Sequence, residues 1–136
     1  LIRMSRLVND SKPLFVMNKV NQAVKTIRKD ASELNIACLG LAFKADIDDL
    51  RESPALSIAL QIETIGFRSI FLVEPNIDQI PDGFHRNDIE LVDQETAVKK
   101  ADIIVLLVDH APFKHMDLSL LSGKQMIDTR GIWSRK

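Results

Sequence analysis

Three short apolar runs, separated by stretches long enough for a helix, constrain the fold of this chain more than any other feature. A near-continuous apolar run of this length is typical of a strand that is buried on both faces of a parallel sheet. The runs are Ile36–Phe43, Ile70–Val73 and Ile103–Val108, and weaker strands are predicted at Ile89–Val92 and Gln125–Asp128. Because helical patterns lie between them, the sequence predicts an α/β fold with a doubly wound parallel sheet and right-handed crossovers.

The segments between these runs carry clear helix signals. Ser53-Pro54 supplies an N-cap and a proline at the first helical position, and the apolar helix that follows ends at Gly66. Asp93 is placed to cap a helix over Gln94–Ala101, and a broken helical stretch covers Pro112–Leu121. Strands and helices therefore alternate along the second part of the chain.

A long amphipathic helix is predicted ahead of the sheet. Its apolar residues recur at three- and four-residue spacing: Met17, Val20, Val24, Ile27 and Ala31. Pro13 interrupts a longer pattern and Asn9–Ser11 are good caps, so the helix is expected over Pro13–Ala31. Leu1–Asn9 is then either an earlier helix tail or a kinked continuation.

This pattern divides the chain into a leading helix at residues 1–31 and a sheet unit at residues 32–136. The apolar stripe would leave exposed area that a small monomer rarely shows, which predicts a homodimer through the helix.

Composition excludes several classes of protein. The chain has 136 residues, of which 46% are hydrophobic and 27% charged, as in an ordinary globular domain. Its net charge of −1 offers no basic field for nucleic acid, and its longest apolar run, Ile103–Val108, is far too short to span a membrane. One cysteine forbids an internal disulfide, and no spacing of Cys, His and acidic residues predicts a metal site. A cytoplasmic protein is expected, and a first residue other than Met favours an excised fragment.

Polar residues follow the predicted strands at the edge where open α/β sheets bind ligands. They are Lys44, Glu74, Asp109-His110 and Asp128–Arg130. These residues form either a polar rim for a ligand or the solvated ends that any strand needs, and for Glu74 and His110 both interpretations stay open. His85 and His115 are expected at the surface.

Several catalytic motifs are absent from the sequence. Glycines stand only at positions 40, 66, 83, 123 and 131, so neither a G-x-G-x-x-G turn nor a P-loop can exist in this chain. Cys38 lies in the middle of an apolar strand without a cationic neighbour, which predicts a buried structural thiol rather than a nucleophile. No catalytic residue is therefore expected in this segment.

The stretch Gly40–Pro54 is the most informative one. It reads as a strand that ends in Lys44, an acidic loop, Arg51 and a capped helix. A helix N-terminus beside two cations favours phosphate. Because four carboxylates lie in the same loop, the two cations must be aimed individually rather than form a general basic patch.

This stretch resembles the signature of the C-terminal, UDP-binding domain of the UDP-glucose/GDP-mannose dehydrogenase family. Val73–Asn76, Leu107–Lys114 and Asp128–Trp133 look most like the UDP-N-acetylmannosamine dehydrogenase branch, and Arg6–Pro13 resembles the connecting helix of the family. The resemblance covers nearly the whole chain.

The resemblance implies a Rossmann-like domain that grips the nucleotide end of a UDP-sugar. Enzymes of the family oxidise the sugar C6 alcohol to a carboxylate with two NAD⁺, through a cysteine thiohemiacetal. The glycine-rich NAD site and that cysteine would both lie upstream of Leu1, so this segment alone is expected to be inactive. The resemblance further implies UDP-N-acetylmannosamine as the substrate, polysaccharide biosynthesis as the role, and a dimer built on the connecting helix.

Site residues follow from the resemblance position by position. Phe43 and Lys44 match a substrate-contacting pair, with Lys44 as a phosphate or sugar ligand. Arg130 lies where the family has an arginine near the nucleotide-sugar, and Arg51 matches an arginine that reaches toward NAD. The competing interpretation is that Lys44 is only solvated and that Arg51 pairs with a carboxylate of its own loop. Cys38 matches no catalytic position.

Two alternatives are non-catalytic modules. A signalling receiver domain is also doubly wound, but here Asp48-Asp49 comes four residues after Lys44 and Arg130 takes the position after the last strand, which disfavours it. A pure dimerisation module would use the leading helix and bind nothing. Binding of UDP separates the dehydrogenase interpretation from both.

Overall fold

The structure is a computed structural model that describes residues 2–41, 54–75, 77, 79–81, 83–84 and 88–129, with the side chains of residues 2–13 and 118 left outside the description. Five parallel strands form one sheet in the order β3-β2-β1-β4-β5. The strands are β1 (Asn35–Leu39), β2 (Ser69–Val73), β3 (Ile89–Leu91), β4 (Ile103–Leu106) and β5 (Gln125–Asp128). Central β1 pairs with β2 on one side and with β4 on the other, so that Cys38 lies between Leu72 and Val105. The predicted doubly wound parallel sheet is confirmed.

Two strands end earlier than predicted. β1 stops at Leu39 rather than Phe43, and β4 stops at Leu106 rather than Val108. Gly40 explains the first of these ends, because its φ of +96° lies outside the extended region that a strand needs. An apolar run therefore overestimates a strand when it continues through the buried loop at the strand's end.

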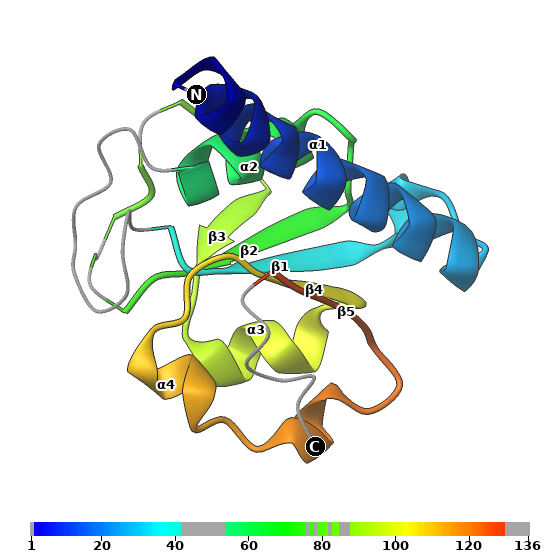
Figure 1. The fold of residues 1–136 in the computed structure, drawn as a ribbon. Coiled ribbons are helices and arrows are strands. Elements are labelled where there is room, and N and C mark those ends of the chain that lie inside the picture. The colour runs from blue at the N-terminus through cyan, green and yellow to red at the C-terminus, as the bar shows by residue number, and fades with distance from the viewer. Residues whose placement is uncertain are drawn as a thin grey trace.

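Helices cover both faces of the sheet, which lies as a middle layer between them (Figure 1). The helix α1 (Ile2–Ile27) and the helix α2 (Pro54–Glu63) lie on one face. The opposite face carries α3 (Gln94–Lys100) and α4 (Ala111–Lys114). Short 3-10 turns at η1 (Ala31–Glu33) and η2 (Leu118–Leu121) precede β1 and β5. The predicted cap of α3 is confirmed, because the Asp93 carboxylate accepts the Thr96 N–H at 2.7 Å.

The leading helix, α1, differs from the predicted helix over Pro13–Ala31. It runs unbroken from Ile2 to Ile27, so Pro13 and the expected cap residues Asn9–Ser11 lie inside it. The positive φ of Arg28 (65°) ends the helix before the predicted Ala31. Of the two alternatives for Leu1–Asn9, residues 2–9 show continuation of the helix, and Leu1 lies outside the described residues. A proline removes one backbone hydrogen bond, at a cost of about 3 kcal/mol, and a helix of 26 residues with a buried face can absorb that cost.

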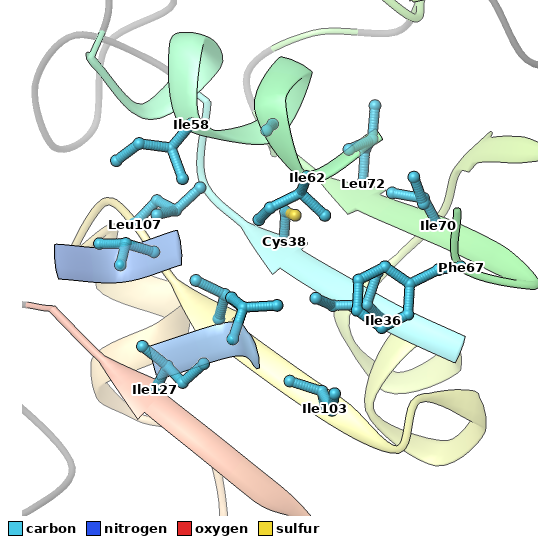
Figure 2. Close-up of a cluster of buried hydrophobic side chains, with 14 of the residues drawn as sticks. Ile36, Cys38, Ile58, Ile62, Phe67, Ile70, Leu72, Ile103, Leu107 and Ile127 are labelled. Atoms are coloured by element: carbon cyan, nitrogen blue, oxygen red, sulfur yellow. The ribbon is translucent and has the colours of Figure 1, made fainter. Parts of the chain in front are cut away.

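Two hydrophobic clusters fill the layers, one on each face of the sheet. In the first cluster Cys38 of β1 points toward Ile62 of α2, Ile36 extends to the same side of the sheet, and α1 completes the cluster (Figure 2). The second cluster packs β1, β2 and β4 against α3 and the segment around Phe113. The side chains of β1 therefore alternate between two dry interiors, which is why its sequence is apolar throughout.

The apolar stripe of α1 is covered by its own chain. Val20 is fully buried in the first cluster, and Met17, Val24 and Ile27 pack against the same cluster. The reason we gave for a dimer through this stripe is therefore wrong, although the dimer itself stays a prediction, as does the division of the chain at residue 31. Within the described ranges, no helix is long and apolar enough to cross a membrane.

Candidate functional site

The strand order reverses between β1 and β4, and the carboxyl ends of those two strands mark where a doubly wound sheet opens a crevice for a ligand. Beyond β1 the chain continues through Gly40 to Leu41, and beyond β4 it continues through Leu107 and Val108 to His110. We call these segments, which follow the carboxyl ends of the strands, the strand exits. Backbone hydrogen bonds hold the first two exits together, because the N–H groups of Leu107 and Val108 donate to Leu39 O at 2.9 and 3.3 Å. A third exit, Glu74, follows β2 on the other side of β1.

Gly40 allows the close approach of these exits. A Cβ built on Gly40 would lie 2.6 Å from the Val108 Cβ and 2.9 Å from the Val108 nitrogen, which no side chain tolerates. Only a glycine, with its positive φ and no Cβ, lets the chain leave β1 in this direction. The glycine that opens the Gly40–Pro54 stretch is therefore a packing requirement of the crevice.

A buried carboxylate lies at the centre of the three exits. Glu74 Oε1 accepts the backbone N–H of Leu41 at 2.8 Å, and His110 Nε2 lies 2.8 Å from the same oxygen. The side chains of Glu74 and His110 are both fully buried. When the ring hydrogen is on Nε2, His110 donates to the carboxylate, so one oxygen receives two hydrogen bonds in a dry environment.

His110 is held from its other side by the start of α4. It occupies the N-cap position of that helix, and its backbone carbonyl accepts the N–H of Phe113 at 3.0 Å. The two rings stand 5.5 Å apart at 57°, a tilted packing of aromatic faces and edges. The position of the imidazole is therefore set by the sheet through Glu74 and by the helix through Phe113.

Glu74 and His110 are not solvated strand ends, which was one of the two interpretations that the sequence allowed for them. They form a buried pair that joins the exits of two strands which are not neighbours in the sheet. The sequence signal was their position directly after apolar runs. The pairing itself depends on strand order, which periodicity does not report.

The other predicted rim residues have different surroundings. Asp109 is half-buried with its Oδ2 at 4.0 Å from Lys114 Nζ, and His115 is exposed as expected. Thr129 is used by the fold, because its hydroxyl donates to Leu106 O at 2.6 Å. Phe43, Lys44, Arg51, Arg130 and His85 lie outside the described residues, so their roles stay predictions.

A small cavity of about 250 Å³ opens beside Glu74, between the ends of β2 and β3 and the starts of α3 and α4. Its walls are Val73, Glu74, Pro75, Val92, Asp93, Gln94 and Pro112. The Gln94 Oε1 is buried without a hydrogen-bond partner in the described part of the chain. The cavity thus adds apolar walls and polar acceptors to the carboxyl edge of the sheet.

The single cysteine takes no part in this edge. Cys38 is fully buried in the middle of β1, and desolvation by burial raises the pKa of its thiol to about 12. A thiol with that pKa supplies almost no thiolate at neutral pH, so the predicted structural role is confirmed. Among the residues that the structure describes, no three His, Cys, Asp or Glu side chains are grouped to hold a metal ion.

Comparison with known proteins gives consistent matches. The sequence model of the UDP-glucose/GDP-mannose dehydrogenase family, UDP binding domain, matches residues 37–135. The chain is 44% identical over 136 residues to an NDP-N-acetyl-D-galactosaminuronic acid dehydrogenase of Ralstonia nicotianae, covering 100% of this chain and 31% of that protein. It is also 44% identical to a UDP-N-acetyl-D-mannosamine dehydrogenase of Yersinia pestis, covering 98% of this chain and 32% of that protein. The chain therefore spans about a third of the length of these relatives.

Solved structures agree with the sequence matches. The UDP-D-ManNAc dehydrogenase of Pyrococcus horikoshii superposes with a TM-score of 0.76 at 28% identity, over 96% of this chain and 30% of that one. The NDP-N-acetyl-D-galactosaminuronic acid dehydrogenase of Methanosarcina mazei gives 0.77 at 25% identity, over 95% of this chain and 27% of that one. The sheet order, the crevice and these matches lead to one conclusion: the chain belongs to the UDP-glucose/GDP-mannose dehydrogenase family and matches its UDP binding domain from residue 37 to residue 135.

Proposed function

We propose that this chain is the UDP-sugar-binding part of an NAD-dependent nucleotide-sugar 6-dehydrogenase that oxidises the C6 alcohol of a UDP-N-acetylhexosamine, UDP-N-acetylmannosamine foremost, to a carboxylate. The observation that carries the proposal is the 44% identity, over nearly the full chain, to enzymes named for N-acetylated uronic acids and N-acetylmannosamine. A role in polysaccharide biosynthesis in the cytoplasm, which the family resemblance implies, belongs to the same proposal.

Within this proposal the chain binds the substrate and another part of the protein performs the oxidation. Phe43 and Lys44 contact the substrate, with the Lys44 ammonium on the diphosphate or sugar, and Arg130 lies near the nucleotide. A charge-assisted hydrogen bond to phosphate contributes about 1.5–3 kcal/mol, more than an exposed ion pair within the acidic loop. Arg51 reaches toward NAD, which is held mainly outside this chain.

The chain's own residues support an inactive segment with an intact binding edge. Cys38 is buried and its thiol pKa lies near 12, so it cannot act as the nucleophile of the family's chemistry. The sequence has no G-x-G-x-x-G turn to cradle a dinucleotide. NAD binding and the covalent step are therefore assigned to residues that precede this chain in the whole enzyme.

Titration calorimetry tests the proposal directly. The purified chain is titrated with UDP, with UDP-N-acetylmannosamine and with GDP as the control for a non-matching base. We expect saturable binding of both uridine ligands and at least tenfold weaker binding of GDP. A chain that binds none of them is a dimerisation or signalling module, and the proposed function is then wrong.

Kinetics of the full-length enzyme distinguish the proposed roles of Lys44 and Arg51. Lys44→Ala is expected to raise the UDP-sugar KM by roughly tenfold or more. Arg51→Ala is expected to raise the NAD⁺ KM and to leave the UDP-sugar KM within about twofold. Equal UDP-sugar KM values for Lys44→Ala and the parent would remove Lys44 from the site.

A further inference from the structure

The buried carboxylate of Glu74 takes over a hydrogen bond that the sheet no longer provides. Gly40 N–H still donates to Val73 O at 2.7 Å, as the last bond of the ladder between β1 and β2. The next amide, that of Leu41, is buried and donates to Glu74 Oε1 instead. A buried backbone N–H must have a partner, so Glu74 determines where the chain lies one residue after the ladder ends.

His110 in turn fixes Glu74. Its Nε2 lies 2.8 Å from the oxygen that receives the Leu41 amide, and its ring packs on Phe113 at the start of α4. One carboxylate oxygen therefore serves two partners at once. One oxygen thus links Leu41 after β1, Glu74 after β2 and His110 after β4, and we expect a change in any of them to displace the other two.

The predicted ligands of the UDP-sugar follow this unit directly in the sequence. Phe43 and Lys44 come two and three residues after Leu41. Three residues of chain span at most about 11 Å, so the Leu41 amide is an anchor, within the described part of the chain, that lies close to Lys44 on its N-terminal side. A displacement at Leu41 is passed on to a side chain that must meet a phosphate within a few tenths of an ångström.

We propose that Glu74 and His110 are positioning residues of the UDP-sugar site: the Glu74 carboxylate, held by the His110 imidazole, anchors the Leu41 amide and thereby aims the segment that carries Phe43 and Lys44. This inference rests on the proposed function. It assigns a role to a side-chain pair that touches no reacting atom, and it explains why a charged group is buried at the end of a strand. Apolar residues of the same volume would pack there at a lower desolvation cost.

Three substitutions at Glu74 separate positioning from packing in the full-length enzyme. Glu74→Leu removes the acceptor and keeps the volume. Glu74→Asp keeps the charge and withdraws the acceptor by about 1.5 Å, one carbon–carbon bond. Glu74→Gln leaves a carbonyl oxygen where Oε1 stands and is the conservative rescue. Glu95→Leu, at an exposed carboxylate of α3, is the matched control.

We expect the UDP-sugar KM to rise roughly tenfold in Glu74→Leu and Glu74→Asp, and to stay within about threefold in Glu74→Gln. The NAD⁺ KM should stay within about twofold throughout, and so should both constants in Glu95→Leu. His110→Leu should match Glu74→Leu, and the double variant should be no worse than either single one, because the two residues act as a unit.

The UDP-sugar KM is the decisive measurement because it does not depend on how much of the enzyme is folded. A purely structural role lowers the apparent kcat and leaves the UDP-sugar KM unchanged, and that result overturns the inference. Glu74→Asp keeps the test open if Glu74→Leu yields no folded enzyme. If Lys44→Ala raises the UDP-sugar KM while Glu74→Asp does not, the positioning role alone fails. If the parent enzyme shows no UDP-sugar dependence, the proposed function fails and this inference with it.

Discussion

Among the glycines that the structure describes, Gly40 is the one whose identity the fold requires most strictly. Its φ of +96°, and the 2.6 Å that would separate an added Cβ from the Val108 Cβ, impose two separate costs on any side chain. A positive φ costs an L-residue about 1–2 kcal/mol, and forcing extra volume into a packed contact costs about 1–3 kcal/mol more. Gly123 (φ +80°) has the first requirement without the second, because a Cβ there meets nothing within 4 Å.

We therefore predict that Gly40→Ala lowers the free energy of unfolding by about 2–5 kcal/mol and Gly123→Ala by about 1–2 kcal/mol. Urea denaturation of both variants and the parent measures the difference. Equal losses in the two variants would mean that the contact with Val108 relaxes and that only the backbone conformation matters.

A second prediction at this scale concerns the pH dependence that Cys38 contributes. Burial raises its pKa from 9.0 to about 12, so the folded state keeps the proton that the unfolded state loses. The stabilisation is complete below pH 9 and is lost as the pH rises from 9 toward 12, by up to about 1.4 kcal/mol per pH unit. Cys38→Ala lacks this titration and is the control for all other groups. Between pH 8 and pH 10.5 the unfolding midpoint should fall further in the parent than in Cys38→Ala. An equal fall in the two proteins would contradict the prediction.

Residues differ in how far the surrounding sequence predicts their burial and their partners. The burial of Cys38 follows from neighbours along its own strand, so periodicity was sufficient. The Glu74–His110 pair joins positions 36 residues apart through a strand order that the sequence does not state. Local pattern thus located the carboxyl edge of the sheet, and only the three-dimensional register showed which of its polar groups are buried together.

Among the elements, the capped helix α3 was predicted well and the proline-containing helix α1 was not. Asp93 before α3 combines a good cap residue with the start of an apolar pattern, so two signals agree at one boundary. In α1 the local signals at Asn9–Pro13 oppose helix continuation, and burial of Val16, Val20 and Ala23 on the sheet outweighs them. Tertiary packing, which a local signal does not contain, decides such cases.

The cap of α3 gives a prediction with a defined pH range. Hydrogen bonds from the Thr96 side chain and backbone lower the pKa of Asp93 below 3.8, so its stabilisation is present above the unfolded pKa and is lost as the pH falls through the folded one. Asp93→Ala should lower the melting temperature by a few degrees at pH 7, and the difference should shrink below about pH 4. Asp93→Asn keeps an acceptor and cannot titrate, so it should retain most of the stability and show no such convergence. Thermal unfolding from pH 3 to pH 7 measures all three proteins.

For the whole molecule, the outer face of α1 determines where a second copy of the chain could bind. The inner face of the helix is buried on the sheet, whereas Leu14 and Phe15 are 64% and 56% exposed. A predicted homodimer therefore cannot use the stripe through Val20. These two neighbouring apolar side chains are the candidates that the described part of α1 leaves for it.

We predict that the chain dimerises through Leu14 and Phe15, which stays a proposal based on the family resemblance and on this exposed pair. Burying a large apolar side chain contributes about 1.5–3 kcal/mol, and a symmetric dimer buries four of them. If the two substitutions remove only half of the lower estimate for these four side chains, the dissociation constant still weakens by roughly 100-fold. Sedimentation of the parent at tens of micromolar should show a dimer, and Leu14→Ser with Phe15→Ser should show a monomer with unchanged thermal stability. Leu120→Ser, at a 42% exposed residue on the opposite face of the sheet, should remain dimeric. A monomeric parent, or a dimer that survives both substitutions, would place the contact elsewhere or remove it.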